Sequence, residues 1–372
     1  MRDNGSVVGR SDSARPSRPY RRGVERLTGI DVARGLAVLG MVTAHVGPDD
    51  PGRTSPADRL LELADGRSSA LFVVLAGLSL ALMSGGRVPL GGRDLRRARV
   101  RVAARAVVVL LVGLVLESLD TPILVILPTY AVLFLAGCVV LRWSTRALVV
   151  AAVAFAVVGP PAREAIGLAA PGTVVDGFGD ELAALVVGPH YPALVWIAYL
   201  LAGLALGRQD LASGAVQRRT ALVGTALTVG GYGAGHLVRL LLGDDAALAS
   251  TRPHSSTTFE VVGNTGVALL VVAACLAVAV RAPRALAPVA AVGALAFTAY
   301  TVQIVVVAAV GPEIVWQPLL TSWLAFVAGT VLACWAWRTW LGRGPLERLL
   351  HGVSTAVAER VVPREPADAG TR

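Results

Sequence analysis

Long apolar runs alternate with short polar segments along most of the chain. A helix needs roughly 20 residues to cross the hydrocarbon core of a membrane. The sequence predicts ten such spans, near residues 28–46, 68–85, 103–119, 121–141, 146–160, 190–207, 220–243, 259–280, 289–311 and 318–340. We therefore predict an all-α, polytopic integral membrane bundle of about ten transmembrane helices. One transmembrane domain at 28–341 lies between a disordered cytoplasmic tail at 1–27 and a cytoplasmic C-terminal tail at 342–372.

Composition supports a membrane protein. Of the 372 residues, 55% are hydrophobic and 16% are charged, and the mean hydropathy is +0.65, which indicates repeated spans. All 34 basic residues are arginine and the net charge is +9. The arginines cluster between the apolar runs, as in loops that face anionic lipid. We therefore expect membrane lipids and no nucleic acid as partners, and we leave a homodimer open.

The arginine distribution predicts an orientation. When successive connections are assigned to alternate sides, one side receives both tails and the arginine-rich segment at 93–101. Few arginines fall on the other side, and these are Arg53, Arg59, Arg67, Arg163 and Arg252. Because basic loops remain cytoplasmic, we predict a multi-pass protein of the cell membrane with both termini in the cytoplasm.

The first span carries charge inside an apolar segment. Arg34 lies about two turns into the span, where an isolated arginine costs about 2.5–3.5 kcal/mol. Asp31 is three residues earlier on the same face and can offset that cost. His45 follows Arg34 by 11 residues, which returns to nearly the same face about 16 Å further along. The pattern fits an anionic donor held at the cytoplasmic end and a base further out, or an arginine and a histidine that only reach the two interfaces.

Other polar residues gather near the predicted outer ends of spans. Four of the five histidines lie there, and Glu260 and Asn264 are one turn apart after His254. Glu260 is either a carboxylate that orients a histidine or acceptor, or a first-turn residue of a helix capped by Thr257 or Thr258. Two further pairs share a helix face and are more often structural than catalytic: His236 with Arg239, and Tyr300 with Gln303.

The three cysteines fall in apolar runs without the spacing of metal ligands. They are Cys138, Cys275 and Cys334. We expect neither a disulfide framework nor a metal site.

Several segments resemble the transmembrane acyltransferase superfamily. RLTGIDVARGLAVLGMVTAH at 26–45 is similar to its first span, in which an arginine precedes a functional histidine by this interval. ALFVVLAGLSLAL at 70–82 and RDLRRARVRVAARA at 93–106 resemble its second span and its basic cytoplasmic loop. HYPALVWIAYLLAGLALGR at 190–208, AFTAYTVQ at 296–303 and RGPLERLLHGVS at 343–354 are similar to a bacterial branch related to the heparan-alpha-glucosaminide N-acetyltransferases.

This resemblance implies acyl-coenzyme A as the co-substrate, with acetyl-CoA as the expected case. By position, Arg34 would orient the donor, and His45 would be the general base or a transient acyl carrier. Arginines of the basic segment would bind the coenzyme A phosphates, and these are Arg93, Arg96, Arg97, Arg99 and Arg101. The sequence has GRSSALF where the heparan enzymes carry a tryptophan- and asparagine-containing pattern, so a cell-surface glycan or lipid is the expected acceptor.

We thus predict a membrane-bound acyltransferase of the cell envelope with His45 and Glu260 as catalytic residues. The predicted substrate-binding residues are Asp31, Arg34, His236, Arg239, His254, Asn264, Tyr300 and Gln303. The alternative is a multi-pass transporter or flippase for a small polar or lipid-linked substrate, although the sequence shows no discontinuous helices in matching halves. A third interpretation is a noncatalytic scaffold in which the buried charges only fix helix pairing.

Overall fold

The computed structural model describes residues 27–48, 61–169, 178–243 and 247–363. Within these ranges there are fourteen α-helices, one short 3₁₀ helix and no β-strand, which confirms the all-α prediction. The predicted disordered tail, apart from Leu27, lies outside the described residues. The predicted C-terminal tail contains a helix of its own.

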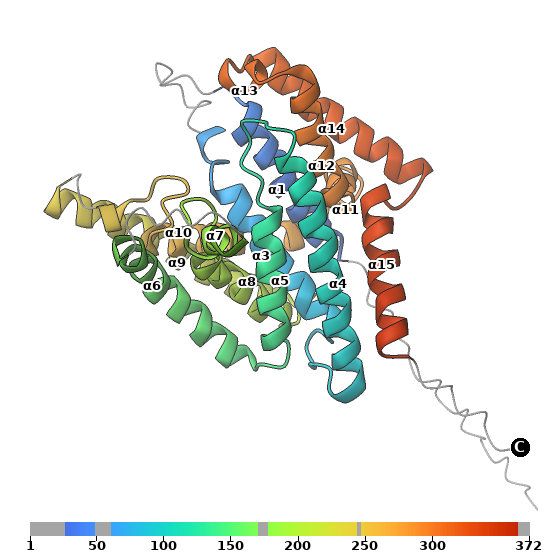
Figure 1. Ribbon diagram of the computed structural model, residues 1–372, viewed down its shortest axis with the longest axis horizontal. Helices are drawn as coiled ribbons and strands as arrows, with labels where there is room; N and C mark the ends of the chain where they lie inside the picture. The colour runs from blue at the N-terminus through green and yellow to red at the C-terminus, as the bar shows by residue number, and fades with distance from the viewer. Residues whose placement is uncertain (1–26, 49–60, 170–177, 244–246, 364–372) are drawn as a thin grey trace, which may run out of the picture.

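The arrangement of the helices is shown in Figure 1. Their bounds are α1 Thr28–Val46, α3 Arg67–Met83, α4 Gly92–Glu117, α5 Leu127–Val140, α6 Thr145–Ala169, α7 Phe178–Val187, α8 Ala193–Gly207, α9 Gly214–Leu242, α10 Thr258–Ala279, α11 Ala287–Ala294, α12 Ala296–Val310, α13 Glu313–Trp316, α14 Leu320–Trp340 and α15 Pro345–Val361, with the 3₁₀ helix at Ala247–Ala249. Of these helices, α7, α13 and α15 are not among those predicted from the sequence. α15 packs alongside α4, and α6 and α9 lie across the bundle from that pair (Figure 1).

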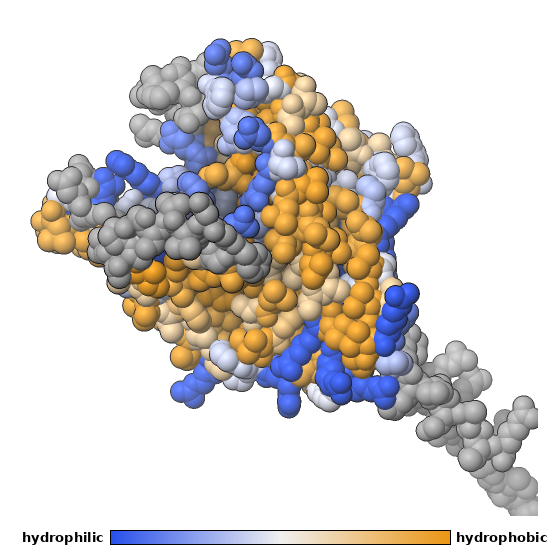
Figure 2. Space-filling view, viewed as in Figure 1, coloured by the Kyte–Doolittle hydropathy of each residue, from blue (hydrophilic) through white to orange (hydrophobic). Residues whose placement is uncertain are grey.

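Several helices have the length and composition of membrane spans. Among the described residues, α1, α6, α10 and α14 are long and apolar enough to cross a membrane, and the bent pair α11–α12 makes up to five. α3, α5 and α8 are shorter apolar helices. Figure 2 shows a broad hydrophobic surface with hydrophilic side chains gathered along its lower edge. The chain is therefore a membrane protein, while the count of ten spans is not confirmed.

Glycines allow the central helices to approach closely. A Cβ atom at Gly77 of α3 would lie 1.9 Å from the carbonyl oxygen of Leu200 in α8. In the same way, a Cβ atom at Gly293 of α11 would lie 1.7 Å from the carbonyl oxygen of Asp31 in α1. Neither distance is compatible with a side chain. Small residues at helix contacts are the usual means of tight packing in membranes, and here they fix α8 against α3 and α11 against α1.

The buried Arg208, which follows α8, joins the ends of three helices. Its guanidinium donates to the carbonyl oxygens of Ala81 in the last turn of α3 and of Gly86 just beyond that helix, at 3.2 and 2.7 Å. It also donates to the carbonyl oxygen of Leu141 after α5, at 2.5 Å. The ends of α3, α5 and α8 therefore meet on one side of the bundle, as alternating spans require. This side, where α4, α6 and α9 begin, is called the basic side.

One predicted span is broken. The sequence predicts a continuous helix over 289–311, but α11 and α12 are separate helices that meet at Leu295 with a bend of 81°. The arginine-rich segment at 93–101 also differs from its prediction as a loop, because it forms the first turns of α4.

Candidate functional site

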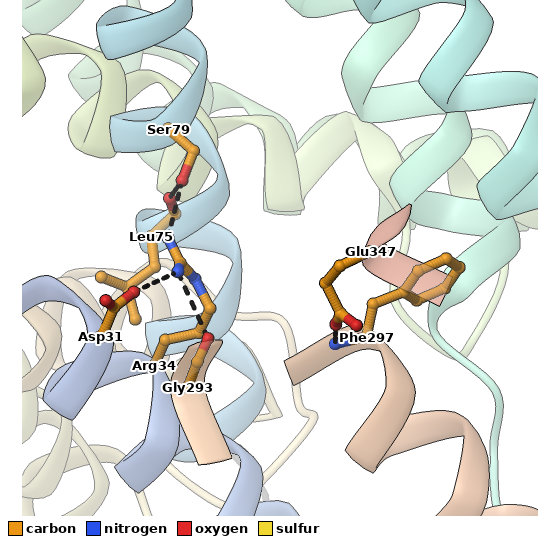
Figure 3. A network of polar contacts seen from close by, with 7 residues as sticks. All are labelled: Asp31, Arg34, Leu75, Ser79, Gly293, Phe297 and Glu347. Carbon is orange, nitrogen blue, oxygen red and sulfur yellow. Dashed lines mark hydrogen bonds and ion pairs between the residues drawn. The ribbon is translucent and has the colours of Figure 1, made fainter. Parts of the chain in front are cut away.

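Arg34 joins three helices within the bundle (Figure 3). Its guanidinium pairs with Asp31 at 3.1 Å, so the ion pair predicted from the i, i+3 spacing is present. It also donates to the Ser79 hydroxyl of α3 at 3.1 Å and to the carbonyl oxygen of Gly293 in α11 at 3.4 Å. These partners compensate a charge that would otherwise be costly inside the membrane. The contacts of Arg34 with Ser79 and with the Gly293 carbonyl could not be predicted from spacing within α1, because these partners lie on other helices.

Opposite charges stabilise the two ends of the broken helix. Arg34 lies at the C-terminal end of α11, where the helix dipole is negative. On the other side of the break, the Glu347 carboxylate accepts a hydrogen bond from the backbone N–H of Phe297 at 2.9 Å (Figure 3) and another from the backbone N–H of Thr298 at 3.0 Å. It also accepts the Thr298 hydroxyl at 2.6 Å. Unpaired backbone groups at helix ends are thus satisfied on both sides of the break.

His45 contacts Gln303 near the end of α1. The Gln303 amide nitrogen lies 2.5 Å from the His45 Nδ1 atom. Gln303 is only 1% exposed, and its other amide atom, Oε1, has no hydrogen-bond partner among the described residues. The Tyr300 hydroxyl, one turn away, accepts the backbone N–H of Ile126 at 3.3 Å. Gln303 therefore faces the histidine, whereas Tyr300 holds the start of α5.

An apolar layer separates Arg34 from His45. Val38 and Met41, which lie between them on α1, are 0% and 2% exposed. Arg34 points to α3 and α11, whereas His45 points to α12. The two residues face neighbouring parts of the same α11–α12 unit, but they do not form a continuous polar track.

Glu260 organises the segment that precedes α10. Its carboxylate accepts the backbone N–H groups of His254 and Ser256, at 2.8 and 2.6 Å. It also accepts the Ser255 hydroxyl at 3.0 Å and the Asn264 amide at 3.2 Å. His254 and Ser256 have φ angles of 61° and 54°, a conformation that is costly for residues other than glycine. These contacts are those of a positioning residue, and a catalytic role for Glu260 stays a prediction.

The predicted helix cap is present as well. The Thr257 hydroxyl accepts the backbone N–H of Glu260 at 3.2 Å, so Thr257 is the capping residue of α10. Of the two interpretations of Glu260, capping by Thr257 with a carboxylate in the first turn is confirmed. The same carboxylate accepts the backbone N–H of His254, and its orientation of the His254 ring or of an acceptor stays a prediction.

His254 lies among aromatic side chains. Its ring stacks on Trp196 with centroids 6.4 Å apart and meets Tyr191 edge-on at 5.2 Å. Burial, with a smaller effect of nearby His190, lowers the pKa of His254. His254 also interacts electrostatically with His45, and the Tyr191 hydroxyl is hydrogen-bonded with Ser69. The ends of α1, α3, α8 and α10 therefore meet here, on the side opposite the basic side.

Asn264 extends this cluster towards α9. Its amide donates to the Tyr199 hydroxyl at 3.3 Å, and its oxygen accepts the Tyr232 hydroxyl at 2.5 Å. The Arg67 guanidinium lies 5.0 Å from the centre of the Tyr232 ring. His236 and Arg239 are also on α9. His236 is exposed, and no contact joins it to this cluster within the described part of the chain. The sequence analysis assigned no role to Tyr191, Trp196 or Tyr199, although all three lie in the segment quoted there, at 190–208.

The arginines of α4 divide into two groups. Arg97 donates to the carbonyl oxygen of Val362 at 2.9 Å and pairs with Glu359 at 3.3 Å, and Arg99 donates to the carbonyl oxygen of Cys138 at 2.9 Å. Arg101 is partly buried further along the helix. Arg93 and Arg96 line a hollow of about 380 Å³, together with Gly92, Val361, Val362 and Pro363, and Arg93 also donates to the carbonyl oxygen of Pro363 at 2.8 Å. Both lining arginines are exposed, so the predicted phosphate-binding role fits them better than the partly buried Arg97 or Arg99.

The fold and these contacts define a helical membrane protein with two polar centres, one around Arg34 and one around His45 and His254. The catalytic family of heparan-alpha-glucosaminide N-acetyltransferase matches residues 26–231. The chain belongs to this family and is an N-acetyltransferase-like membrane protein. A second match, over residues 206–356, is to a family described as a protein of unknown function (DUF418). No curated protein matches the chain. Arg34 and His45 lie within the first match, and Glu260, Gln303 and Glu347 lie within the second.

Proposed function

We propose that the protein transfers an acetyl group from acetyl-coenzyme A on the basic side to an amine or hydroxyl acceptor on the opposite side. The observation that carries this proposal is the His45–Gln303 contact, which places an imidazole beside a buried amide within a chain of the acetyltransferase family. The predicted acceptor is a glycan or a lipid of the cell surface. The basic side is proposed to face the cytoplasm.

Gln303 sets which nitrogen of His45 can act as a base. A side-chain amide can turn either its oxygen or its nitrogen towards a neighbour, because the two ends have the same shape. With the oxygen facing Nδ1, Gln303 accepts a hydrogen bond from Nδ1–H, so the proton stays on Nδ1 and Nε2 is unprotonated. We propose this orientation for the active protein.

In this arrangement, Nε2 takes the proton of the acceptor as its nitrogen or oxygen attacks the acetyl carbonyl carbon. The bond between that carbon and the sulfur breaks, and coenzyme A leaves as the free thiol with the proton that Nε2 has taken up. In the alternative order, Nε2 attacks the acetyl carbon, the carbon–sulfur bond breaks and coenzyme A leaves as the thiolate. The acceptor then attacks the same carbon, the bond to Nε2 breaks, and the proton of the acceptor passes to the thiolate. Both orders use the same histidine and the same amide.

His254 and its aromatic neighbours are proposed to bind the acceptor. Ligand sites combine flat apolar surfaces with a few placed polar groups, and Trp196, Tyr191 and the His254 ring provide such a combination. From α10, Glu260 accepts the backbone N–H of His254 and the Asn264 amide, and so holds the His254 backbone in place. This assigns Glu260 a positioning role in the proposed reaction.

The donor is proposed to bind from the basic side. Arg93 and Arg96 line the hollow there, and guanidinium groups form strong charge-assisted hydrogen bonds with phosphates. The thioester then has to pass the layer of Val38 and Met41 to reach His45. Methionine has a flexible side chain that adapts to different packing. We therefore propose that the Met41 side chain moves aside to let the thioester pass.

The test is an assay of purified protein with acetyl-coenzyme A and a glycan amine, in which release of free thiol and labelled product are both measured. We expect His45→Ala to lower transfer by at least a hundredfold. His351→Ala is the matched control, because His351 is exposed on α15 and has no proposed role, and this variant should retain the activity of the unaltered protein. Full transfer by His45→Ala would contradict the proposal.

A transporter is the second candidate, and the broken helix favours it. Discontinuous spans line substrate paths in many transporters, and α11–α12 is one such span. Substrate flux into vesicles without release of free thiol would support transport. Release of one thiol for each product formed would support the enzyme.

A further inference from the structure

A long groove runs between α6 and α9 on the surface of the bundle. Its volume is about 440 Å³. α8 and α10 form its floor, since α6 packs on α8 and α9 packs on α10. The groove does not contain any of the residues proposed for acetyl transfer.

The lining of the groove is largely apolar. Its walls are Val149, Val153 and Val157 of α6 and Val223 and Leu227 of α9. The face of α8 that forms the floor presents alanines, Ala198, Ala202 and Ala205, whose small side chains leave the space open. Apolar cavities do not hold ordered water, so an apolar chain is the appropriate occupant within a membrane.

The groove has the length of one membrane leaflet. Its lining on α6 extends from Thr145 to Val157, a rise of roughly 18 Å at about 1.5 Å per residue. The hydrocarbon core is about 30 Å thick, so the groove covers about half of it. One acyl chain of a lipid therefore matches the groove in length.

Most of the polar lining residues lie at the basic end of the groove. Gln209 and Thr145 meet there, with the Gln209 amide 3.4 Å from the Thr145 hydroxyl. Arg219 and Thr220 line the same end from the start of α9, and Arg219 is exposed. An apolar channel that ends at a guanidinium and hydroxyl groups is complementary to a lipid whose headgroup carries a negative phosphate.

We propose that the groove binds an anionic phospholipid from the leaflet on the basic side, with one acyl chain between α6 and α9 and the phosphate at Arg219. Lipid tails are as apolar as the groove, so burial of the chain adds little affinity over the surrounding bilayer. Selectivity among lipids is therefore set mainly by Arg219. This inference does not depend on the proposed acetyl transfer.

The test uses the full-length protein in nanodiscs that contain a phosphatidylglycerol with a photoreactive group on its acyl chain. Cross-links should map to residues 145–157 of α6 and 216–227 of α9. Ala202→Leu fills the groove and should abolish these cross-links, whereas Ala226→Leu, on an exposed face of α9 outside the groove, should retain them. Arg219→Gln should lower phosphatidylglycerol cross-linking roughly fivefold, and Arg218→Gln, at the exposed neighbouring position, should not.

Three outcomes would overturn the inference. Equal cross-linking of Ala202→Leu and Ala226→Leu would show that the label reports bulk lipid. Equal labelling of the protein by phosphatidylglycerol and phosphatidylcholine probes would contradict the proposed selection of anionic lipids by Arg219. Cross-links between two protein chains through Val153→Cys and Val223→Cys would show that a second copy covers the groove instead.

Discussion

Removal of the Glu347 carboxylate should destabilise the protein through the broken helix. Glu347 accepts three hydrogen bonds at the start of α12, from the backbone of Phe297 and Thr298 and from the Thr298 hydroxyl. Each hydrogen bond to a charged group contributes about 1.5–3 kcal/mol, and the contributions of groups that act together are not additive. The negative charge also lies at the positive end of the α12 dipole. We expect Glu347→Ala to lower the free energy of unfolding by about 3 kcal/mol.

The matched control is Glu359→Ala on the same helix, α15. Glu359 pairs with Arg97 at 3.3 Å, but its side chain is 53% exposed. Exposed ion pairs contribute about 0–1 kcal/mol, so this variant should be close to the unaltered protein. Comparison of the two variants distinguishes the effect of losing the carboxylate that caps α12 from the effect of losing any acidic charge on α15.

Thermal denaturation in detergent can be followed with a thiol-reactive dye. Cys138, Cys275 and Cys334 are free thiols within helices, and the last two are buried, so all three become more reactive as the protein unfolds. For a chain of this size, a loss of 1 kcal/mol lowers the melting temperature by roughly 1–2 °C. Glu347→Ala should therefore melt roughly 3–6 °C lower and Glu359→Ala within about 1 °C. Equal melting temperatures for Glu347→Ala and the unaltered protein would refute the capping of the break.

Three further predictions concern the His45 and His254 cluster. Gln303→Leu should lower the rate of acetyl transfer at saturating substrate by about 10–100-fold with a small change in KM, because the amide positions a base rather than binding substrate; an unchanged rate would exclude that role. Glu260→Ala should lower the free energy of unfolding by about 2–4 kcal/mol, because several buried hydrogen bonds are lost; thermal denaturation measures this, and a shift no larger than that of Glu359→Ala would contradict it. The depressed pKa of His254 means that the unfolded chain binds its proton more readily. The contribution of His254 to the stability of the protein should therefore be constant above about pH 6.5, the ordinary histidine pKa, and fall as the pH is lowered below it. His254→Gln should weaken that fall in a series of melting temperatures against pH, and an identical pH profile would contradict the assignment.

Local spacing predicted the contacts that helix geometry fixes. Asp31 meets Arg34 because residues three apart share a helix face, and Thr257 caps α10 because its hydroxyl reaches the N–H group three residues later. All-α architecture followed from the length of the apolar runs. The predictions that needed only one helix were therefore the most successful.

Contacts between helices were not predictable in the same way. The partners of Arg34 on α3 and α11 depend on which helices pack together, and nothing in the spacing of Ser79 or Gly293 indicates this. The break at Leu295 was missed because the surrounding residues are uniformly apolar and Gly293 is one of many small residues in the chain. The arginines at 93–101 were interpreted as a loop because of their charge, although arginine favours helices. The partners of Arg97 on α15 and of Arg99 on α5 could not be predicted from the sequence, because they depend on which helices pack against α4.

The most direct measurement of acetyl transfer across the membrane uses sealed vesicles in which the protein has one known orientation. Labelled acetyl-coenzyme A is supplied only on the basic side, and an impermeant amine sugar is enclosed on the other. The proposed function predicts labelled N-acetyl sugar inside, with one free thiol outside for each product, and the loss of both with His45→Ala. Labelled product that forms only on the basic side, or entry of the label without free thiol, would contradict it.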